Sequence, residues 1–178
     1  VRLAVENAIH EMKKTGASVN ALGELEEALV ETDSLVATID RFRTFARRAS
    51  DRVLGKVSLE AIVDKIMRLL QESARQAKIT LDVRGLDSLP MIWGYEKDLE
   101  QLFFALAQNA IQAAGGRKNR RLSITGERFE DRIELCFEDN CGGIASKDLP
   151  HIFEPFFTTK SPTQGTGLGL CIVQRVVN

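Results

Sequence analysis

Residues 152 to 170 read "IFEPFFTTKSPTQGTGLGL", and the last six of them place glycine at every second position, directly before an apolar run. Glycine at this density is entropically costly in a regular helix or strand. The pattern therefore predicts a backbone that takes a positive φ, or one that another group approaches closely. A helix that starts here would present free N–H groups and the positive end of its dipole, which suit a phosphate. These six residues alone leave open the alternative of an ordinary glycine-rich loop or helix cap.

Composition bounds the class of protein. The chain has 178 residues, of which 44% are hydrophobic and 28% charged, the balance of a soluble globular protein with one domain, or one small domain plus an appendage. A formal net charge of −1 gives no overall basic field, so we expect no nucleic-acid partner. No apolar run approaches the roughly 20 residues that cross a bilayer. Three cysteines without a C-x-x-C pair fit a reducing compartment. We expect a cytoplasmic location, with a membrane anchor in a longer protein left open.

A helical hairpin is predicted over residues 1–52. No proline occurs between residues 22 and 48, where seven residues recur at alternating steps of three and four: Leu25, Ala28, Thr32, Leu35, Ile39, Phe42 and Ala46. This spacing is the heptad seam of a helix in a bundle. A lone hairpin buries little apolar surface, so we expect a second copy of the chain to complete a four-helix bundle, as a homodimer. Packing of the seam against the rest of the same chain is the alternative.

Helices and strands alternate irregularly after residue 52. Ser58 is a predicted N-cap, and Gly115 a predicted helix stop. The predicted elements are a helix over 58–77, strands over 79–83 and 89–93, a helix over 98–114, and strands over 122–129 and 133–137 that turn at 130–131. Because no strict βαβ repeat occurs, the pattern favours an α/β sandwich over a doubly wound sheet.

Two further stretches carry polar residues that suit a ligand. Asn109 lies in "ALAQNAIQAA", residues 105–114, where an amide among apolar residues is either a surface side chain or an oxygen ligand for a hard cation such as Mg²⁺. Asp139 follows a predicted strand in "EDNCGGI", residues 138–144. Its carboxylate is either part of a turn or an acceptor for the exocyclic amine of a flat ring.

Together, and behind a helical hairpin, these stretches with "IFEPFFTTK" and "GTGLGL" resemble the dimerisation and catalytic regions of sensor histidine kinases. The kinases share an ATPase superfamily with gyrase B, mismatch-repair ATPases and the ATP-driven heat-shock chaperone, which lack the flap sequence "IFEPFFTTK". The resemblance implies an α+β fold. Residues 1–52 would be the hairpin, its first helix truncated, and 53–178 an ATP-binding α/β sandwich of the Bergerat type. Since the family's domain continues past the last helix, we expect its C-terminal strands to be missing.

The resemblance also implies roles for individual residues. Asn109 corresponds to the magnesium ligand, Asp139 to the aspartate that reads the adenine amine, and Gly143 to the glycine that admits the adenine ring. The implied cofactors are ATP and Mg²⁺. The implied ATP-binding residues are Asn109, Gln112, Asp139, Asn140, Gly143, Phe157, Thr158, Lys160, Gly165, Thr166, Gly167, Leu168 and Gly169.

Three positions depart from the pattern of the family. Ala105 stands where these kinases often carry Asn or Glu, one helical turn before the magnesium ligand. Gln112 stands where many carry a basic residue that contacts the phosphates. Both changes predict weaker metal or phosphate binding, or its supply by another group. Cys141 replaces a glycine of the adenine motif and is small enough to be tolerated.

The phosphoacceptor histidine is expected upstream of Val1. His10 begins "HEMKK", which resembles the acceptor motif without its proline. Only about 35 residues separate His10 from "FRTFARR", whereas a full hairpin needs roughly 50 at 1.5 Å per residue. His10 is therefore the lesser alternative for the acceptor. His151, directly before the flap sequence, is expected to pack or to face solvent.

The function implied is transfer of the γ-phosphoryl of ATP to a histidine, and from there to an aspartate of a response-regulator receiver domain. One alternative is a degenerate kinase that binds nucleotide or dimerises without phosphotransfer, which Ala105 and the lack of a clear acceptor favour. Another is an ATPase of the gyrase or chaperone type. An ATPase of that type needs a carboxylate base one turn before Asn109, and Ala105, at that position, has no carboxylate.

Overall fold

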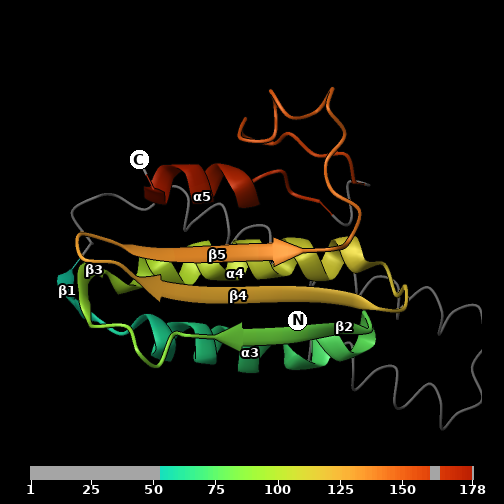
Figure 1. Ribbon diagram of the computed structural model, residues 1–178. Coiled ribbons are helices and arrows are strands. Elements are labelled where there is room, and N and C mark those ends of the chain that lie inside the picture. Colours follow the sequence, from blue (N-terminus) through green and yellow to red (C-terminus); the bar gives the residue numbers. More distant parts are fainter. Residues whose placement is uncertain (1–52, 161–164, 178) are drawn as a thin grey trace, which may run out of the picture. The chain divides into compact units, whose positions relative to one another are not determined.

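The computed structural model describes residues 53–160 and 165–177 (Figure 1). The predicted helical hairpin and His10 lie outside these residues and stay predictions. Residues 53–157 and 167–177 lie in one compact unit, whereas 158–160 and 165–166 group apart from it and are described by themselves. The elements of the compact unit are β1 (Leu54–Val57), α3 (Leu59–Gln76), β2 (Ile79–Arg84), β3 (Ile92–Tyr95), α4 (Glu96–Ala114), β4 (Arg120–Arg128), β5 (Ile133–Asp139) and α5 (Gly169–Val177).

Helices α3 and α4 follow their sequence signals closely. The Oγ of Ser58 accepts a hydrogen bond from the backbone N–H of Ala61 at 3.1 Å, which caps α3 as predicted. Helix α4 begins at Glu96, before the predicted Asp98, because β3 runs directly into it. It ends as predicted, where Gly115 takes a φ of +55°. Within the described ranges, no helix is long and apolar enough to cross a membrane.

Strand β4 is the centre of the main sheet, whose strand order is β2-β4-β5. Strand β2 pairs with β4 in parallel, with Ile79 opposite Arg120. Strand β5 pairs with β4 antiparallel, with Asp139 opposite Leu122, and the turn between them lies at 130–131 as predicted. Strands β1 and β3 form a separate antiparallel pair. Strand β1 was not predicted, and β3 begins at Ile92 rather than at residue 89, because such short strands depend on their partner more than on local sequence.

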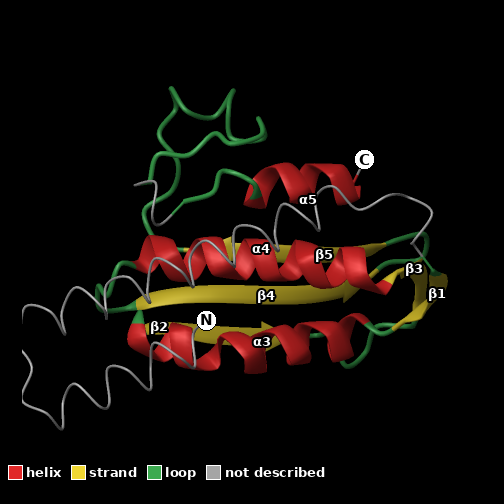
Figure 2. Cartoon of the chain, turned by 180° about the vertical axis from the view of Figure 1, so that it is seen from behind, coloured by secondary structure: helices red, strands yellow, loops and turns green. Residues whose placement is uncertain are grey.

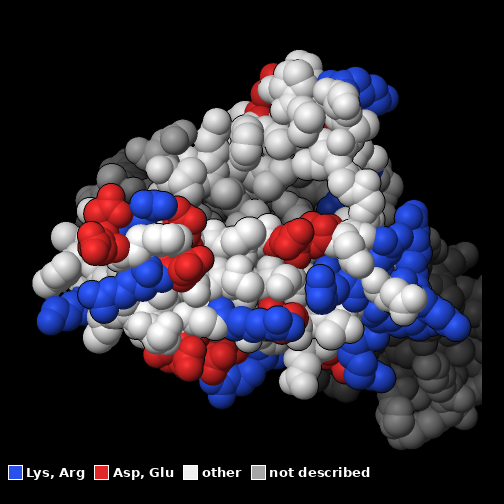
Figure 3. All heavy atoms as spheres, viewed as in Figure 1, with Lys and Arg blue, Asp and Glu red and all other residues white. Residues whose placement is uncertain are grey.

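Helices α3 and α4 cover one face of the main sheet, as two opposite views show (Figures 1 and 2). Helix α5 packs against α4. The opposite face of the sheet carries exposed polar residues at alternate positions, among them Arg84, which pairs with Asp82 at 2.7 Å. Figure 3 shows charges of both signs spread over that face. The largest fully buried side chains are Val63, Phe103, Ile124 and Leu168. This mixed helix-and-sheet arrangement confirms the predicted fold class.

Glu100 joins α3 to α4. Its carboxylate accepts hydrogen bonds from the Nζ of Lys65 at 2.6 Å and the Nζ of Lys97 at 3.0 Å. Burial raises the pKa of Glu100, but these two bonds outweigh burial, and the net pKa lies below its ordinary value of 4.5. The ionised carboxylate therefore stabilises the fold above pH 4.5, and this contribution is lost as the pH falls through the folded-state pKa.

We expect Glu100→Gln to lower the free energy of unfolding at pH 7 by less than about 1 kcal/mol, since solvent screens both exposed lysines. Urea unfolding at pH 7 and at about pH 3 measures this effect, and the difference from wild type should shrink at the lower pH. The exposed Glu130, in the β4–β5 turn, offers the control Glu130→Gln. An equal difference at both pH values would contradict an ionic origin.

Candidate functional site

A tight turn follows β5 at the first predicted site residue. The Oδ1 of Asp139 accepts a hydrogen bond from the backbone N–H of Cys141 at 2.8 Å. Gly142 and Gly143 then take φ values of +125° and +71°, which favour glycine, and no atom lies within 4 Å of a Cβ added at either. Cys141 is not among the residues with positive φ. A cysteine can therefore replace the expected glycine there without backbone strain.

The side chain of Asn140 fastens this turn to the start of β4. Its Oδ1 accepts from the backbone N–H of Arg121 at 2.8 Å, and its Nδ2 donates to the carbonyl of Asn119 at 3.0 Å. The Nη1 of Arg120 donates to the backbone carbonyl of Asn140. Both ends of the amide are thus used within the protein. Sequence reasoning missed this support, which depends on the antiparallel pairing that brings the start of β4 beside the end of β5.

Asn109 and the start of α5 lie against one another. A Cβ added to Gly169, the first residue of α5, would lie 3.4 Å from the Nδ2 and 3.6 Å from the Oδ1 of Asn109. A glycine at this position leaves room beside the amide. The amide oxygen of Asn109, a half-buried residue of α4, therefore lies next to the N–H groups at the N-terminus of α5.

These residues fit a magnesium–phosphate group. An amide oxygen is a ligand that Mg²⁺ accepts, and the helix N-terminus suits the phosphates that share the ion. Within residues 53–160 and 165–177, no group of three or more His, Cys, Asp or Glu residues could hold a metal. The protein would therefore supply few ligands, and the phosphates and water the rest, which is the usual way that Mg²⁺ binds beside a nucleotide.

The flap and the glycine loop meet at Phe156 and Gly167. The backbone N–H of Phe156 donates to the carbonyl of Gly167 at 3.0 Å. Phe156 has a φ of +68°, a rare and strained conformation for a bulky residue, and Gly167 has a φ of +64°. A Cβ added to Gly167 would overlap backbone atoms of Phe156. The next residue, Leu168, is 1% exposed and anchors the loop in the core.

His151, directly before the flap, lies against Phe157 of the flap. Their ring centroids are 5.6 Å apart, and the Nδ1 of His151 lies 2.8 Å from the Oε1 of Glu154. His151 thus both packs on a ring and remains exposed, which agrees with its expected structural role.

The remaining flap and loop residues are described by themselves. The Oγ1 of Thr158 accepts from the backbone N–H of Lys160 at 3.1 Å. A Cβ added to Gly165 would lie 2.9 Å from the Cβ of Lys160, so these segments approach closely. Thr166 is half-buried. The roles predicted for these residues, and for Gln112, stay predictions.

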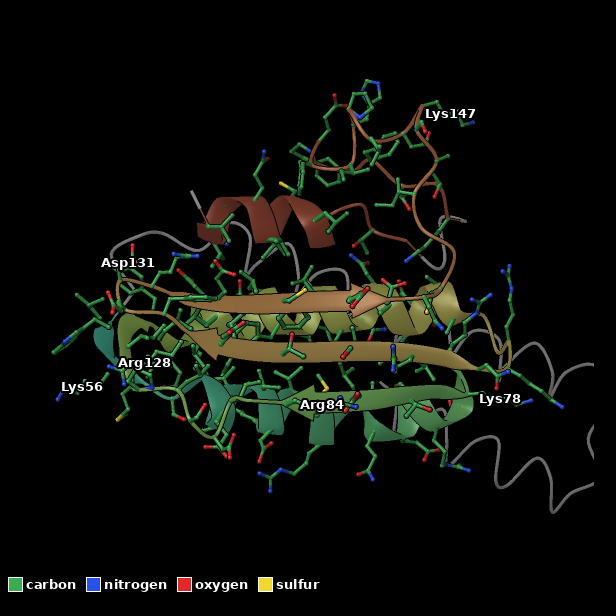
Figure 4. All side chains as sticks on the ribbon, in the orientation of Figure 1. Lys56, Lys78, Arg84, Arg128, Asp131 and Lys147 are labelled. Carbon is green, nitrogen blue, oxygen red and sulfur yellow. The ribbon has the colours of Figure 1, made fainter. Side chains whose placement is uncertain are left out.

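Basic side chains gather at the end of the main sheet where β5 finishes. Figure 3 shows Lys and Arg concentrated there, and Figure 4 places Lys78 at that end, at the start of β2. The loop from α4 into β4 adds exposed Arg117 and Lys118, and the start of β4 adds exposed Arg121. This positive field beside the Asp139 turn would attract a polyphosphate anion.

Comparisons with known proteins bear on the family and the fold of the chain. Residues 94–178 match the family described as histidine kinase-, DNA gyrase B-, and HSP90-like ATPase. The sensory histidine kinase/phosphatase NtrB of Rhizobium leguminosarum bv. phaseoli is 34% identical over 162 residues, 83% of this chain and 41% of NtrB. The solved catalytic domain of histidine kinase ThkA aligns with a TM-score of 0.59 at 28% identity, over 70% of this chain and 80% of that one. ThkA in complex with the response regulator protein TrrA aligns with a TM-score of 0.67 over 94% of this chain and 48% of that one, but at 21% identity it shows the fold alone.

Residues 94–178 therefore belong to the histidine kinase-, DNA gyrase B-, and HSP90-like ATPase family, and the curated relatives that match the chain are sensor histidine kinases. This confirms the family predicted from the motifs, and an ATPase domain implies that the chain binds ATP. The chain spans 41% of the length of NtrB. The activity of a complete sensor kinase is therefore stated for this chain only as a proposal.

Proposed function

We propose that this chain is the ATP-binding and catalytic core of a sensor histidine kinase. It would transfer the γ-phosphoryl of ATP to a histidine, and from there to an aspartate of a response regulator. The observation that carries the proposal is the placement of the Asn109 amide against Gly169, at the start of α5, because it joins a cation ligand to a phosphate-binding helix end.

In this mechanism the protein binds and positions the nucleotide. The carboxylate of Asp139 would accept a hydrogen bond from the adenine amine, and the open backbone at Gly143 would lie beside the ring. The N–H groups at the start of α5 would donate to the phosphates. Asn109 would hold Mg²⁺, which when bound neutralises phosphate charge. Such positioning, with the γ-phosphoryl in line with the attacking imidazole, is the main source of catalysis in phosphoryl transfer.

The other predicted contacts complete the proposed site. Gln112 and Lys160 would lie near the phosphates, and the flap and glycine loop would cover them. The residues proposed for this cover are Phe157, Thr158, Gly165, Thr166, Gly167 and Leu168. Asn140 would act chiefly by holding the turn that carries Asp139, as its four hydrogen bonds with β4 and the preceding loop suggest.

The proposed partners follow from the proposal that the chain is the core of a sensor histidine kinase. Residues 1–52 would form the dimerisation hairpin of a homodimer, with the phosphoacceptor upstream of Val1 and His10 as the lesser alternative. ThkA, a relative of known structure, has been solved with a response regulator, and we infer a partner of that class for this chain. The location proposed is cytoplasmic. No comparison favours a degenerate kinase without phosphotransfer.

A titration of the chain with ATP and ADP, with and without Mg²⁺, tests the proposal. Asp139→Asn should raise the Kd for ATP by about tenfold to a hundredfold, because the new amide can present a donor where the adenine amine needs an acceptor. Glu138→Gln is the matched control, since it removes the same charge from the neighbouring position, whose side chain lies on the opposite face of β5. Equal weakening by both variants, or no ATP binding by wild type, would contradict the proposed site.

A further inference from the structure

Arg120, the first residue of β4, carries a guanidinium on the core-facing side of the sheet. Side chains alternate between the two faces of β4, and Arg120 shares its face with the buried Leu122 and Ile124. Arg120 is half-buried, and its Nε is buried without a hydrogen-bond partner among the described residues. A buried donor that stays unpaired costs free energy. This cost points to a role of Arg120 beyond the stability of the fold.

The peptide unit between Asn140 and Cys141 joins Arg120 to Asp139. Its carbonyl, which belongs to Asn140, accepts a hydrogen bond from the Nη1 of Arg120. Its N–H, which belongs to Cys141, donates to the Oδ1 of Asp139 at 2.8 Å. Because the peptide unit is planar and trans, its carbonyl and its N–H point in opposite directions, and the two bonds hold one plane from both sides. The cation at one end and the carboxylate at the other polarise the unit in the same sense, which strengthens both bonds.

The other bonds of the turn hold Asn140 but leave this plane free. The Asn140 amide binds backbone groups at the start of β4 and in the loop before it, and the Asn140 backbone N–H donates to the carbonyl of Arg121 at 3.3 Å. Among the hydrogen bonds of the described residues, the Asn140 carbonyl accepts from Arg120 alone. Gly142, which follows the peptide unit, has a φ of +125° and resists rotation little. Without Arg120 the plane would be free to turn, and its N–H would leave the Asp139 carboxylate.

We propose that Arg120 is a positioning residue for recognition of the nucleotide base. It fixes the peptide unit whose N–H holds the Asp139 carboxylate, so that the remaining acceptor sites of that carboxylate face the amino group of a 6-aminopurine nucleotide. The proposal rests on the proposed function, because it requires that Asp139 reads the base. Arg120 acts through the peptide unit and not by touching the nucleotide. Its loss would therefore weaken recognition of the amino group and spare the contacts with the phosphates.

Two nucleotides that differ in that amino group test the proposal. The Kd values of ATP and of purine riboside triphosphate, which lacks the amine, are measured for wild type, Arg120→Met, Arg120→Lys and Asp139→Asn. Arg120→Met should raise the Kd for ATP by roughly fivefold, the effect of one hydrogen bond, and leave that for purine riboside triphosphate nearly unchanged. Arg120→Lys keeps a cationic donor and should recover part of the loss.

Arg121→Met is the matched control. It removes the same charge from the next residue, whose exposed side chain points to the opposite face of β4 and whose bonds with Asn140 are made by its backbone. It should leave the ratio of the two Kd values unchanged. Hydrogen exchange of the Cys141 amide, measured without nucleotide, should be faster in Arg120→Met than in wild type or Arg121→Met, because the bond to Asp139 opens more often.

The outcomes separate this inference from the proposed function. If Asp139→Asn loses its preference for ATP while Arg120→Met keeps it, the positioning role is wrong and the site stands. Equal weakening of both nucleotides by Arg120→Met would show a general effect of charge or structure and overturn the inference, as would an unchanged exchange rate of the Cys141 amide. Wild type that binds neither nucleotide would overturn both. If the methionine variant does not fold, Arg120→Gln, whose amide is too short to reach the Asn140 carbonyl, takes its place.

Discussion

Gly167→Ala is expected to weaken ATP binding by about tenfold to a hundredfold, because backbone strain costs about 1–3 kcal/mol and each 1.4 kcal/mol is tenfold in Kd. The new Cβ would overlap backbone atoms of Phe156, and no side-chain movement can relieve an overlap with backbone. Alanine is also strained at a φ of +64°. The glycine loop would have to move away from Phe156 of the flap. Because this loop leads into α5, the start of that helix would shift as well. Titration with ATP and Mg²⁺ measures the effect.

Gly55→Ala provides the matched control. Gly55 lies in β1, has no positive φ, and has no atom within 4 Å of an added Cβ. It should bind ATP as wild type does, and its melting temperature should change little. Wild-type affinity in Gly167→Ala would contradict the close contact with Phe156. Circular dichroism of both variants establishes that any loss of binding is not a loss of the fold.

Phe103→Ala is expected to lower the free energy of unfolding by about 3–5 kcal/mol, the range for large aromatic side chains removed from a core. Phe103 lies in the middle of α4 and is 1% exposed. Its ring stacks on that of Phe137 in β5, with centroids 5.5 Å apart. The truncation leaves a cavity between the helix that carries Asn109 and the strand that ends at Asp139, so nucleotide affinity should fall as well. Urea unfolding measures the stability.

Phe153→Ala makes the same chemical change at an exposed position of the flap, where the side chain is 40% exposed. It should cost far less stability, within about 1 kcal/mol, because little buried surface and no large cavity is involved. Similar losses for the two variants would contradict the assignment of Phe103 to the core.

Local signals explain which elements of the fold could be predicted. The cap at Ser58, the stop at Gly115 and the turn at 130–131 depend on residues within one turn of chain, and all three are confirmed. Strand β1 depends instead on pairing between Leu54 and Tyr95, far apart in sequence. No local pattern reports such a partner, which is why β1 was missed and the start of β3 was misplaced.

The same distinction holds for the candidate site. Short motifs indicate Asn109, Asp139 and the glycines, because each needs a particular residue type at a particular place. The bond from Arg120 to the Asn140 carbonyl and the positive φ of Phe156 could not be predicted. The bond depends on the pairing of β4 with β5, and the positive φ depends on the contact of Phe156 with Gly167. Phenylalanine by itself disfavours a positive φ. Their tertiary surroundings impose them.

The parallel pairing of β2 with β4 also bears on synthesis of the chain. Once β2 has left the ribosome, about 40 further residues must be added before its partner strand exists, which takes about 2–8 seconds at usual translation rates. During this interval the edge of β2 has no neighbour, and α3 has no complete sheet to cover. Premature association between nascent chains is therefore expected to begin at β2, and a holdase chaperone that shields this strand would protect the whole domain.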